Sequence, residues 1–236
     1  MDIVTPENKK ESYRLFDKIA KTYDLLNIIL SLGIDRIWRR KITKLIGNSK
    51  IENAVDLATG TADMAILLGK KKNITQVLGL DMSKEMIGIG KQKVLRGKLA
   101  QKVTLEIGDG MNIPLESSSQ DLITITFGIR NYGDYMKGLK EMHRILKEKG
   151  RCIIMEFSLP KNFLIKKFYL FYFRKFLPLI GRIISKDDMA YTYLNKTVES
   201  FPYGEHFSEK MKEAGFSNIK IHELTLGIAS IYVAEK

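Results

Sequence analysis

The chain has 236 residues, 39 of them Lys or Arg against 27 Asp or Glu, so its formal net charge is +12, and 44% of its residues are hydrophobic. This balance is typical of one globular domain and excludes a mainly disordered chain, because enough apolar surface is present to offset the entropy of ordering. The 18 Gly, 5 Pro and single Cys exclude the collagen-like and disulfide-stapled classes.

The N-terminal residues Met1–Val4 lead straight into polar sequence, so we expect no secretory signal. No apolar run reaches the roughly 18 residues that a membrane-spanning helix needs. The thiol of Cys152 lies in a strand-like run, and a single thiol fits a reducing compartment. We therefore expect a cytoplasmic protein, either soluble or bound at the inner face of the cytoplasmic membrane.

Short apolar runs alternate with helical patterns through the middle of the chain. The five runs cover residues 53–58, 77–81, 103–107, 121–126 and 151–157. Such alternation predicts a parallel sheet covered on both faces by helices. Two more runs, 218–224 and 228–234, are separated by only three residues. Because a parallel crossover needs about ten residues or more, this pair is predicted to be an antiparallel hairpin. The expected fold is α/β, a doubly wound, mostly parallel seven-stranded sheet with its last strand reversed.

Two helix boundaries can be predicted from local chemistry. Ser83, followed by Glu85, has the hydroxyl and the first-turn acid of a helix start. A helix containing Leu139, Met142, Ile145 and Leu146 is expected to stop at Lys149-Gly150.

Two segments stand outside the alternation, although we expect residues 1–236 to form a single domain. Residues 1–50 are predicted to be an N-terminal helical lid, and residues 158–205 a helical insertion between the fifth and sixth strands. Ligands of open parallel sheets bind beyond the carboxyl ends of the strands. Both segments can reach that edge and cover a site there.

The insertion contains an unusual basic and aromatic stretch. Residues 161–186 hold seven Lys or Arg, no acid and seven aromatic residues. Three interpretations remain open: a core helix with a solvated basic face, a surface for an anionic membrane, or a surface on which RNA bases stack.

Three successive strand ends carry groups that suit a nucleoside. Gly60 allows a tight turn after the first strand. Asp81 ends the second strand 21 residues later, the distance at which an acid accepts both hydroxyls of a ribose. Asp109, between Gly108 and Gly110, ends the third strand and can accept from an adenine amino group. For Asp81 and for Asp63 the alternative is a helix N-cap.

The turn itself indicates which nucleoside cofactor to expect. A dinucleotide loop requires G-x-G-x-x-G, and these positions read Gly60, Ala62 and Ala65. The G-x-x-x-x-G-K-[ST] loop for phosphates is absent. A ligand with ribose and adenine but no phosphate fits better, and S-adenosyl-L-methionine is such a ligand.

Several further strings accompany these motifs. They are residues 16–27 (FDKIAKTYDLLN), 31–39 (SLGIDRIWR), 56–63, 127–131 (FGIRN), 155–160 (MEFSLP) and 191–202. With them the chain resembles the ubiquinone/menaquinone biosynthesis C-methyltransferase family, class I S-adenosyl-L-methionine-dependent enzymes, over nearly its whole length. The chain departs from the family at Ala62, where glycine is usual, and at Thr126, where serine is common. Alanine does not favour a strongly positive φ.

The resemblance implies both ligands. The implied cofactor contacts are Thr61, Asp81, Asp109 and Gly110. Gly60 of the turn and Thr126 are further candidates for cofactor binding. The implied substrate is a prenylated quinol methylated on a ring carbon, either demethylmenaquinol in menaquinone biosynthesis or the ubiquinone precursor 2-polyprenyl-6-methoxy-1,4-benzoquinol. A polyprenyl tail lies in the bilayer, so the resemblance also favours the membrane interpretation of the insertion.

Three residues are candidates for catalysis. Arg130 follows the fourth strand and can stabilise a ring oxyanion, with a surface ion pair to Asp134 as the alternative. Asn131 can orient a ring oxygen or cap the next helix. Tyr23 and Asp24 can close over the site. The alternatives are helix packing for Tyr23 and a solvated acid for Asp24.

The remaining expectations concern partners. The three histidines show no paired metal spacing, so we predict no metal. We expect no nucleic-acid partner, and dimerisation through the insertion is a hypothesis. The rival functions are a methyltransferase of another small lipid or metabolite, a basic RNA-binding protein or RNA methyltransferase, and a homologue that binds the cofactor without turnover.

Overall fold

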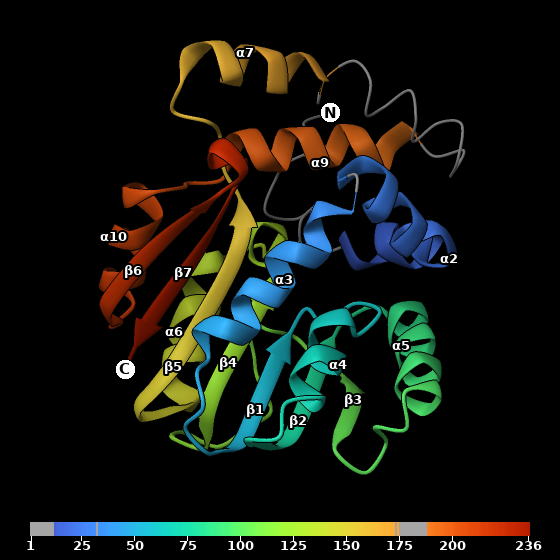
Figure 1. Ribbon diagram of the computed structural model, residues 1–236, viewed down its shortest axis with the longest axis vertical. Helices are drawn as coiled ribbons and strands as arrows, with labels where there is room; N and C mark the ends of the chain where they lie inside the picture. The colour runs from blue at the N-terminus through green and yellow to red at the C-terminus, as the bar shows by residue number, and fades with distance from the viewer. Residues whose placement is uncertain (1–11, 32, 173, 175–187) are drawn as a thin grey trace.

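The computed structural model describes residues 12–31, 33–172, 174 and 188–236, and Figure 1 shows their arrangement. The sheet has seven strands in the order β3-β2-β1-β4-β5-β7-β6. The strands are β1 (Ile51–Leu57), β2 (Ile74–Asp81), β3 (Val103–Ile107), β4 (Gln120–Thr126), β5 (Leu146–Phe157), β6 (Ser217–Leu224) and β7 (Ala229–Glu235). Neighbours from β3 to β5 pair in parallel, whereas β7 is antiparallel to both β5 and β6. The predicted fold class and the reversed last strand are confirmed.

Helices cover both faces of this sheet. They are α2 (Ser12–Ser31), α3 (Ile34–Leu45), α4 (Asp63–Gly69), α5 (Lys84–Arg96), η1 (Ile129–Asn131), α6 (Tyr135–Ile145), α7 (Phe163–Phe171), α9 (Asp188–Ser200), α10 (Glu205–Glu213) and η3 (Thr225–Gly227). One core cluster joins the sheet to α3, α4 and α5, and a second joins its other face to α6 and α10. Each fully buried Leu, Ile or Met in these clusters contributes about 1.5–3 kcal/mol to folding.

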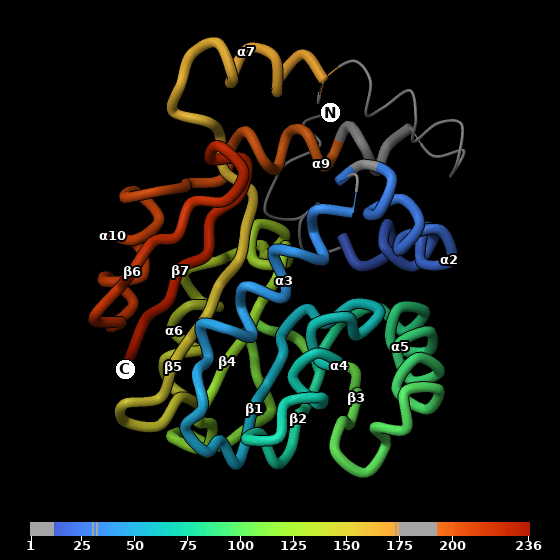
Figure 2. The backbone as a smooth tube through the Cα atoms, in the orientation of Figure 1, coloured from blue at the N-terminus to red at the C-terminus, as the bar shows by residue number. Residues whose placement is uncertain are grey.

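A third apolar cluster lies beyond the carboxyl ends of the strands. It joins α2, α7 and α9 through Ile19, Leu26, Tyr169 and Val198. Figure 2 shows α2, α7 and α9 on the same side, over the strand ends. In the described part of residues 1–50 the chain forms the helices α2 and α3.

Polar side chains cap two of the helices, α5 as the sequence predicts and α6 with a different residue from the one expected. The Ser83 hydroxyl accepts a hydrogen bond from the Met86 amide and caps α5. The Asp134 carboxylate accepts from the Lys137 amide, 3.0 Å away, and caps α6. Asp134 is therefore the cap of the helix that Asn131 was expected to cap, and that alternative for Asn131 is wrong.

The predicted end of α6 is also wrong. The helix stops at Ile145, and Leu146 is already extended, with φ −74° and ψ 134°, and pairs with Gln120 of β4. Lys149 has φ 61° and lies within β5, where the register with β4 shifts. Leu146 is buried on the sheet as it would be on the helix, so the apolar pattern did not distinguish the two.

The insertion does not contain a core helix at α7. In this helix Phe163 is 75% exposed, Leu164 62%, Phe168 74% and Phe171 57%, and only Tyr169 is buried. The interpretation as a core helix with a solvated basic face is therefore wrong for α7, because the apolar side chains themselves face solvent. Five residues of the predicted basic and aromatic stretch lie outside the described residues, namely Phe173, Lys175, Phe176, Arg182 and Lys186. Across the described ranges, we find no helix with the length and apolarity to cross a bilayer.

Candidate active site

Two adjoining cavities lie at the carboxyl edge of the sheet. The larger, of about 430 Å³, is enclosed by α2, α3, α7 and α9 and is mainly apolar; we call it the roof cavity. The smaller lies against the ends of β1, β2, β3 and β4, where the strand order reverses between β1 and β4; we call it the edge cavity. Phe16, Tyr23 and Phe127 line both. Ligands of doubly wound sheets bind at such a reversal.

The turn after β1 is tight and contains three residues with a positive, left-handed φ. Ala58 has φ 47°, Gly60 φ 56° and Ala62 φ 68°. The buried carboxylate of Asp56 supports this turn, because it accepts hydrogen bonds from the Thr59 and Thr124 hydroxyls, both at 2.6 Å. Burial raises the pKa of Asp56 to about 6, against these hydrogen bonds, which lower it. The positive φ predicted to be unfavourable for Ala62 is thus present.

Asp81 lines the edge cavity from the end of β2. One carboxylate oxygen accepts from the Gly60 amide and the other from the Ser83 amide, both at 2.8 Å. Since Ser83 caps α5, the N-cap alternative for Asp81 is wrong. Burial raises the pKa of Asp81 above its ordinary value, against the backbone hydrogen bonds that lower it. Each carboxylate oxygen keeps a second lone pair for a ligand hydroxyl.

Asp109 and Gly110 follow β3, on the same side of the reversal as Asp81, and both line the edge cavity. Asp109 accepts from the Met111 amide at 2.8 Å. A Cβ at Gly110 would lie 1.8 Å from the Tyr132 hydroxyl, so only glycine fits this position.

The edge cavity contains polar atoms that lack partners. Among the residues that the structure describes, the Asn131 amide oxygen and the Tyr132 hydroxyl are buried without a hydrogen-bond partner. Both residues line the cavity. Buried polar groups are nearly always satisfied, so these atoms indicate a polar ligand. Together with the carboxylates of Asp81 and Asp109 they fit the ribose and adenine of a nucleoside.

The edge cavity holds about 90 Å³. This is below the ~300 Å³ of ordinary ligand pockets, so side chains must move for a nucleoside to enter. Ser12, Tyr13 and Phe16 of α2 line it and are the candidates to move.

Two predicted cofactor residues, Thr61 and Thr126, are placed differently. Thr126 lines the edge cavity, and its hydroxyl accepts from Arg39 at 2.6 Å. Thr61 is buried outside the lining, and its hydroxyl donates to Asp24 of α2 at 2.6 Å. Lys93 of α5 bridges Asp24, at 3.0 Å, and Asp63. Asp63 is therefore an ion-pair partner and not a helix cap, and Asp24 fastens α2 to the turn.

Arg130 lines the roof cavity and is 5% exposed. One guanidinium nitrogen donates to a carboxylate oxygen of Glu156 at 2.8 Å and also to the Phe127 carbonyl. The predicted alternative of a surface ion pair with Asp134 is wrong, because Arg130 is buried and its partner is Glu156 at the end of β5.

The other two catalytic candidates are Tyr23, which lies where the two cavities meet, and Asn131, which lies in the edge cavity. Tyr23 lines both cavities and packs edge-on against Phe16, with ring centroids 6.1 Å apart. Its packing and its place at the site are therefore compatible. Asn131 lines only the edge cavity.

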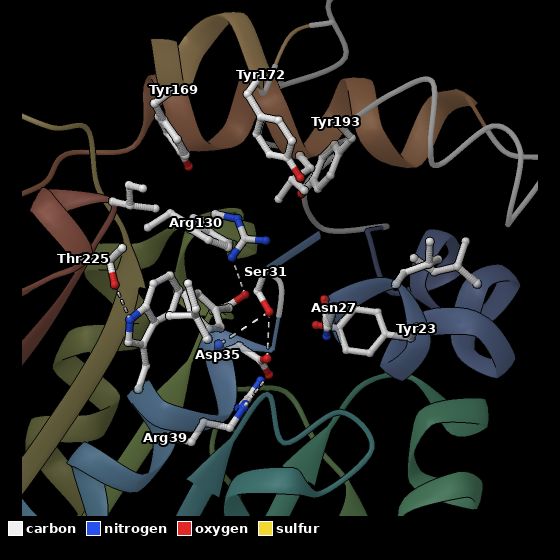
Figure 3. A pocket seen from close by; sticks show the side chains of 18 of the residues that line it. Tyr23, Asn27, Ser31, Asp35, Arg39, Arg130, Tyr169, Tyr172, Tyr193 and Thr225 are labelled. Carbon is white, nitrogen blue, oxygen red and sulfur yellow. Dashed lines mark hydrogen bonds and ion pairs between the residues drawn. The ribbon is translucent and has the colours of Figure 1, made fainter. Parts of the chain in front are cut away.

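Several polar residues of the roof cavity were not singled out from the sequence. Asp35 and Arg39 of α3 are 6% and 7% exposed, and Figure 3 shows them below Ser31 in the cavity. The Trp38 indole donates to the Thr225 hydroxyl at 2.9 Å and joins α3 to η3. The available signal was an acid and an arginine four residues apart on the face that also carries Trp38.

Comparison with known proteins agrees with the nucleoside site described above. The model of the ubiE/COQ5 methyltransferase family matches residues 4–236. The chain belongs to this family. It uses S-adenosyl-L-methionine as its cofactor. The chain is similar to a ubiquinone/menaquinone biosynthesis C-methyltransferase UbiE of Geotalea daltonii, 44% identical over 98% of both chains. It is also similar to a demethylmenaquinone methyltransferase of Bacteroides fragilis, 39% identical over 94% of this chain and 91% of the other.

A solved structure gives an independent comparison of the fold of this ubiE/COQ5 family member. The fold of this chain is similar to that of a SAM-dependent methyltransferase, a possible histamine N-methyltransferase, from Thermotoga maritima. The TM-score is 0.68 at 18% identity, over 95% of this chain and 99% of the other. At this identity the likeness concerns the fold alone.

Proposed function

We propose that this family member transfers a methyl group from S-adenosyl-L-methionine to a ring carbon of a prenylated quinol, with demethylmenaquinol as the physiological substrate. The choice of substrate rests on the roof cavity. It is an apolar volume of about 430 Å³ next to the edge cavity, and the buried Arg130 lines it. A quinol ring with a prenyl tail needs apolar walls and a few polar contacts for its oxygens. The relatives' names agree with this choice.

In the proposed arrangement the edge cavity holds the cofactor. Asp81 accepts from the ribose hydroxyls, and Asp109 accepts from the adenine amino group. Gly60 and Gly110 allow close approach of the backbone, Thr61 supports the turn from behind, and Thr126 lies beside the sulfonium end. The unpartnered Asn131 and Tyr132 oxygens support a polar occupant.

The chemistry places its main demand on positioning. The cofactor supplies an electrophilic methyl group on a positively charged sulfur. Transfer is an in-line displacement, so holding the ring carbon in line provides most of the acceleration. Tyr23 and Phe127, which line both cavities, are placed to align the ring.

Arg130 supplies the electrostatic part in this proposal. Aromatic carbon is a poor nucleophile, and ionising the neighbouring hydroxyl moves electron density onto it. A guanidinium stays protonated and stabilises the oxyanion. Glu156 and the Phe127 carbonyl fix the guanidinium, so no reorganisation is needed when charge develops.

A mass measurement tests the proposed function. The protein is incubated with S-adenosyl-L-methionine and, separately, reduced demethylmenaquinone and the reduced 6-methoxy ubiquinone precursor. We expect the quinol product to gain one methyl group and S-adenosyl-L-homocysteine to form in equal amount. Binding of the cofactor without any methylated quinol contradicts the proposal.

We also propose that α7 contacts the bilayer that contains the prenyl tail. The exposed Phe163, Leu164 and Phe168 lie on the same helix as Lys166 and Lys167. Apolar and basic side chains together suit an anionic membrane surface. Phe168 and Tyr169 also line the roof cavity, so a tail can pass from the bilayer into it beside α7.

Vesicle sedimentation tests the membrane contact. Wild-type protein is expected to sediment with phosphatidylglycerol vesicles at low salt, and Phe163→Ser/Phe168→Ser to bind at least about tenfold more weakly, since two large apolar side chains are lost. Leu95→Ser, which removes an exposed leucine from α5, is the matched control. Equal binding of all three proteins, or no binding by the wild type, contradicts the proposal.

A further inference from the structure

Asp35 is a buried carboxylate that the proposed chemistry has not used. It lies in the first turn of α3, is 6% exposed and lines the roof cavity. Arg130 reaches the same cavity from η1, after β4. Figure 3 shows Asp35 and Arg130 on separate elements with Ser31 between them in the view. Two groups of opposite charge thus face one apolar cavity from different sides.

The contacts of Asp35 hold it in place and leave it able to accept another hydrogen bond. One carboxylate oxygen accepts from the Ser31 hydroxyl at 2.8 Å. The other lies 3.7 Å from the Arg39 Nε, an ion pair too long for a good hydrogen bond. Because a carboxylate accepts about four hydrogen bonds, Asp35 has capacity for a ligand.

Asp35 is connected to the cofactor side through two contacts. Arg39, its ion-pair partner, donates to the Thr126 hydroxyl at 2.6 Å. Thr126 lines the edge cavity, whereas Asp35 and Arg39 line the roof cavity. A ring hydroxyl bound by Asp35 therefore lies near the junction of the two cavities, which is where the methyl group must be received.

The reaction needs a proton acceptor, and Arg130 is not one. Arg130 remains protonated and is held by Glu156 and the Phe127 carbonyl. Among the described residues that line the roof cavity, Asp35 is the only carboxylate. A general base must lie within hydrogen-bond reach of the proton it removes, and Asp35 is placed to do so.

We infer that Asp35 is the proton acceptor for the ring hydroxyl next to the methylated carbon; this rests on the proposed function. The O–H bond breaks and its proton moves to Asp35, while the oxygen electron pair shifts into the ring. The ring carbon forms a bond to the methyl group as the S–C bond breaks and its electron pair returns to sulfur. The C–H proton then leaves to water, Asp35 returns its proton to the oxygen, and the ring becomes aromatic again. One proton is released overall.

Single-turnover methylation tests the assignment on a pair of substrates. The first is the reduced demethylquinone, and the second is a ring-fluorinated analogue whose hydroxyl is already ionised at the assay pH. For Asp35→Asn we expect methylation of the first to slow by about 10²–10⁴-fold, the range of general base catalysis. Methylation of the second is expected to slow by less than about tenfold, because no base is needed for an ionised hydroxyl.

Two controls accompany this variant. Glu52→Gln makes the same acid-to-amide change at an exposed surface pair and is expected to leave both rates unchanged. Calorimetry is expected to give the same S-adenosyl-L-methionine affinity for Asp35→Asn and wild type. If Asp35→Asn does not fold, Asp35→Glu keeps the carboxylate and is expected to methylate the first substrate within about tenfold of wild type.

The outcomes are distinct. A rate for Asp35→Asn within about fivefold of wild type overturns the assignment, and so does an equal loss on both substrates, which would indicate a structural role. A loss beyond a hundredfold in a folded Asp35→Glu protein with normal cofactor affinity also overturns it. If wild-type protein methylates neither quinol, it is the proposed function that fails.

Discussion

The edge cavity and the roof cavity are built in different ways from the same chain. The edge cavity takes its carboxylates from the ends of consecutive strands, at Asp81 and Asp109, within about 50 residues of the turn at Gly60. The roof cavity draws on α2, α3, η1, α7, α9 and η3, and its lining residues run from Leu15 to Ile228. The rigid sheet edge suits a cofactor with fixed geometry, whereas packed helices suit a substrate with a long apolar tail. The following substitutions, ordered by expected effect, test that division.

Replacing Arg130 should give the largest effect, and on the roof side only. Arg130→Ala is expected to lower kcat by about 10²–10³-fold, as for loss of an oxyanion contact. It also leaves Glu156, 1% exposed, without its ion-pair partner, which lowers the free energy of unfolding by about 3–5 kcal/mol. Steady-state kinetics and urea unfolding measure the two, with Arg130→Lys as the charge-conserving control.

The cofactor affinity of Arg130→Ala should stay close to that of wild type. Near-wild-type turnover at saturating substrate would remove Arg130 from the chemistry. A loss of cofactor affinity as large as the loss of kcat would contradict the separation of the two cavities.

Asp56 should make the sheet edge sensitive to pH. Its pKa in the folded protein is about 6, above the ordinary 3.8, because burial disfavours the ionised form. The folded state therefore binds this proton more tightly, so the stability contributed by Asp56 is full below pH 4 and is lost as the pH rises through 6. The difference is about 3 kcal/mol.

Urea unfolding at pH 4 and pH 7 measures this contribution. Wild-type protein should lose more of its free energy of unfolding than Asp56→Asn does when the pH is raised from 4 to 7. The difference between the two losses should be about 3 kcal/mol. An identical pH dependence in the two proteins would show that Asp56 ionises normally in the fold.

Asp81 tests the edge cavity directly. Asp81→Ala is expected to weaken S-adenosyl-L-methionine binding by about 10–100-fold, because the ribose loses hydrogen bonds to a charged group. Glu106→Gln, on the exposed face of β3, is the matched acidic control. Calorimetry measures both affinities, and an unchanged value for Asp81→Ala would remove the ribose assignment.

Asp24 links the two regions, since it fastens α2 to Thr61 and Lys93. This cluster is partly exposed, so Asp24→Asn is expected to change the free energy of S-adenosyl-L-homocysteine binding by less than about 1 kcal/mol. We expect S-adenosyl-L-homocysteine to dissociate about two- to fivefold faster, because α2 opens more readily. Stopped-flow fluorescence measures this rate, and slower dissociation would contradict the role of α2 as a lid.

The smallest effect is expected at Ala62. Its φ of 68° is unfavourable for alanine, but its methyl group is fully buried. In Ala62→Gly the relief of backbone strain and the loss of about 0.8 kcal/mol of methyl burial nearly cancel, so stability should change by less than about 1 kcal/mol. Ala62→Val should be clearly less stable. Thermal unfolding compares the three, and equal stability of Val and Ala would show that strain is absent.

The division between the cavities also explains what the sequence could predict. Strand periodicity places Asp81 and Asp109 at one sheet edge, because parallel strands end on the same side. Arg130 was placed correctly by its position after β4, but its buried partner Glu156 is 26 residues away and no local pattern links them. Asp35 and Arg39 stand four residues apart in α3, and no role was predicted for either from the sequence. Only the packing of α3 against the strand ends turns that pair toward a cavity.

Predictions that rested on apolar residues alone were ambiguous. Leu146 is buried on the sheet rather than on α6, and one hydrophobic position cannot choose between them. In α7, aromatic residues were compatible with a core or an exposed surface. Burial is decided by what packs against a helix, and that information is not local in the sequence.

A crystal structure of the protein with S-adenosyl-L-homocysteine tests the central claim most directly. We expect the ribose hydroxyls within hydrogen-bond distance of Asp81, the adenine amino group at Asp109, and the sulfur directed past Phe127 toward the roof cavity. A nucleoside bound elsewhere, or in the edge cavity with its sulfur turned away from the roof cavity, would contradict the account.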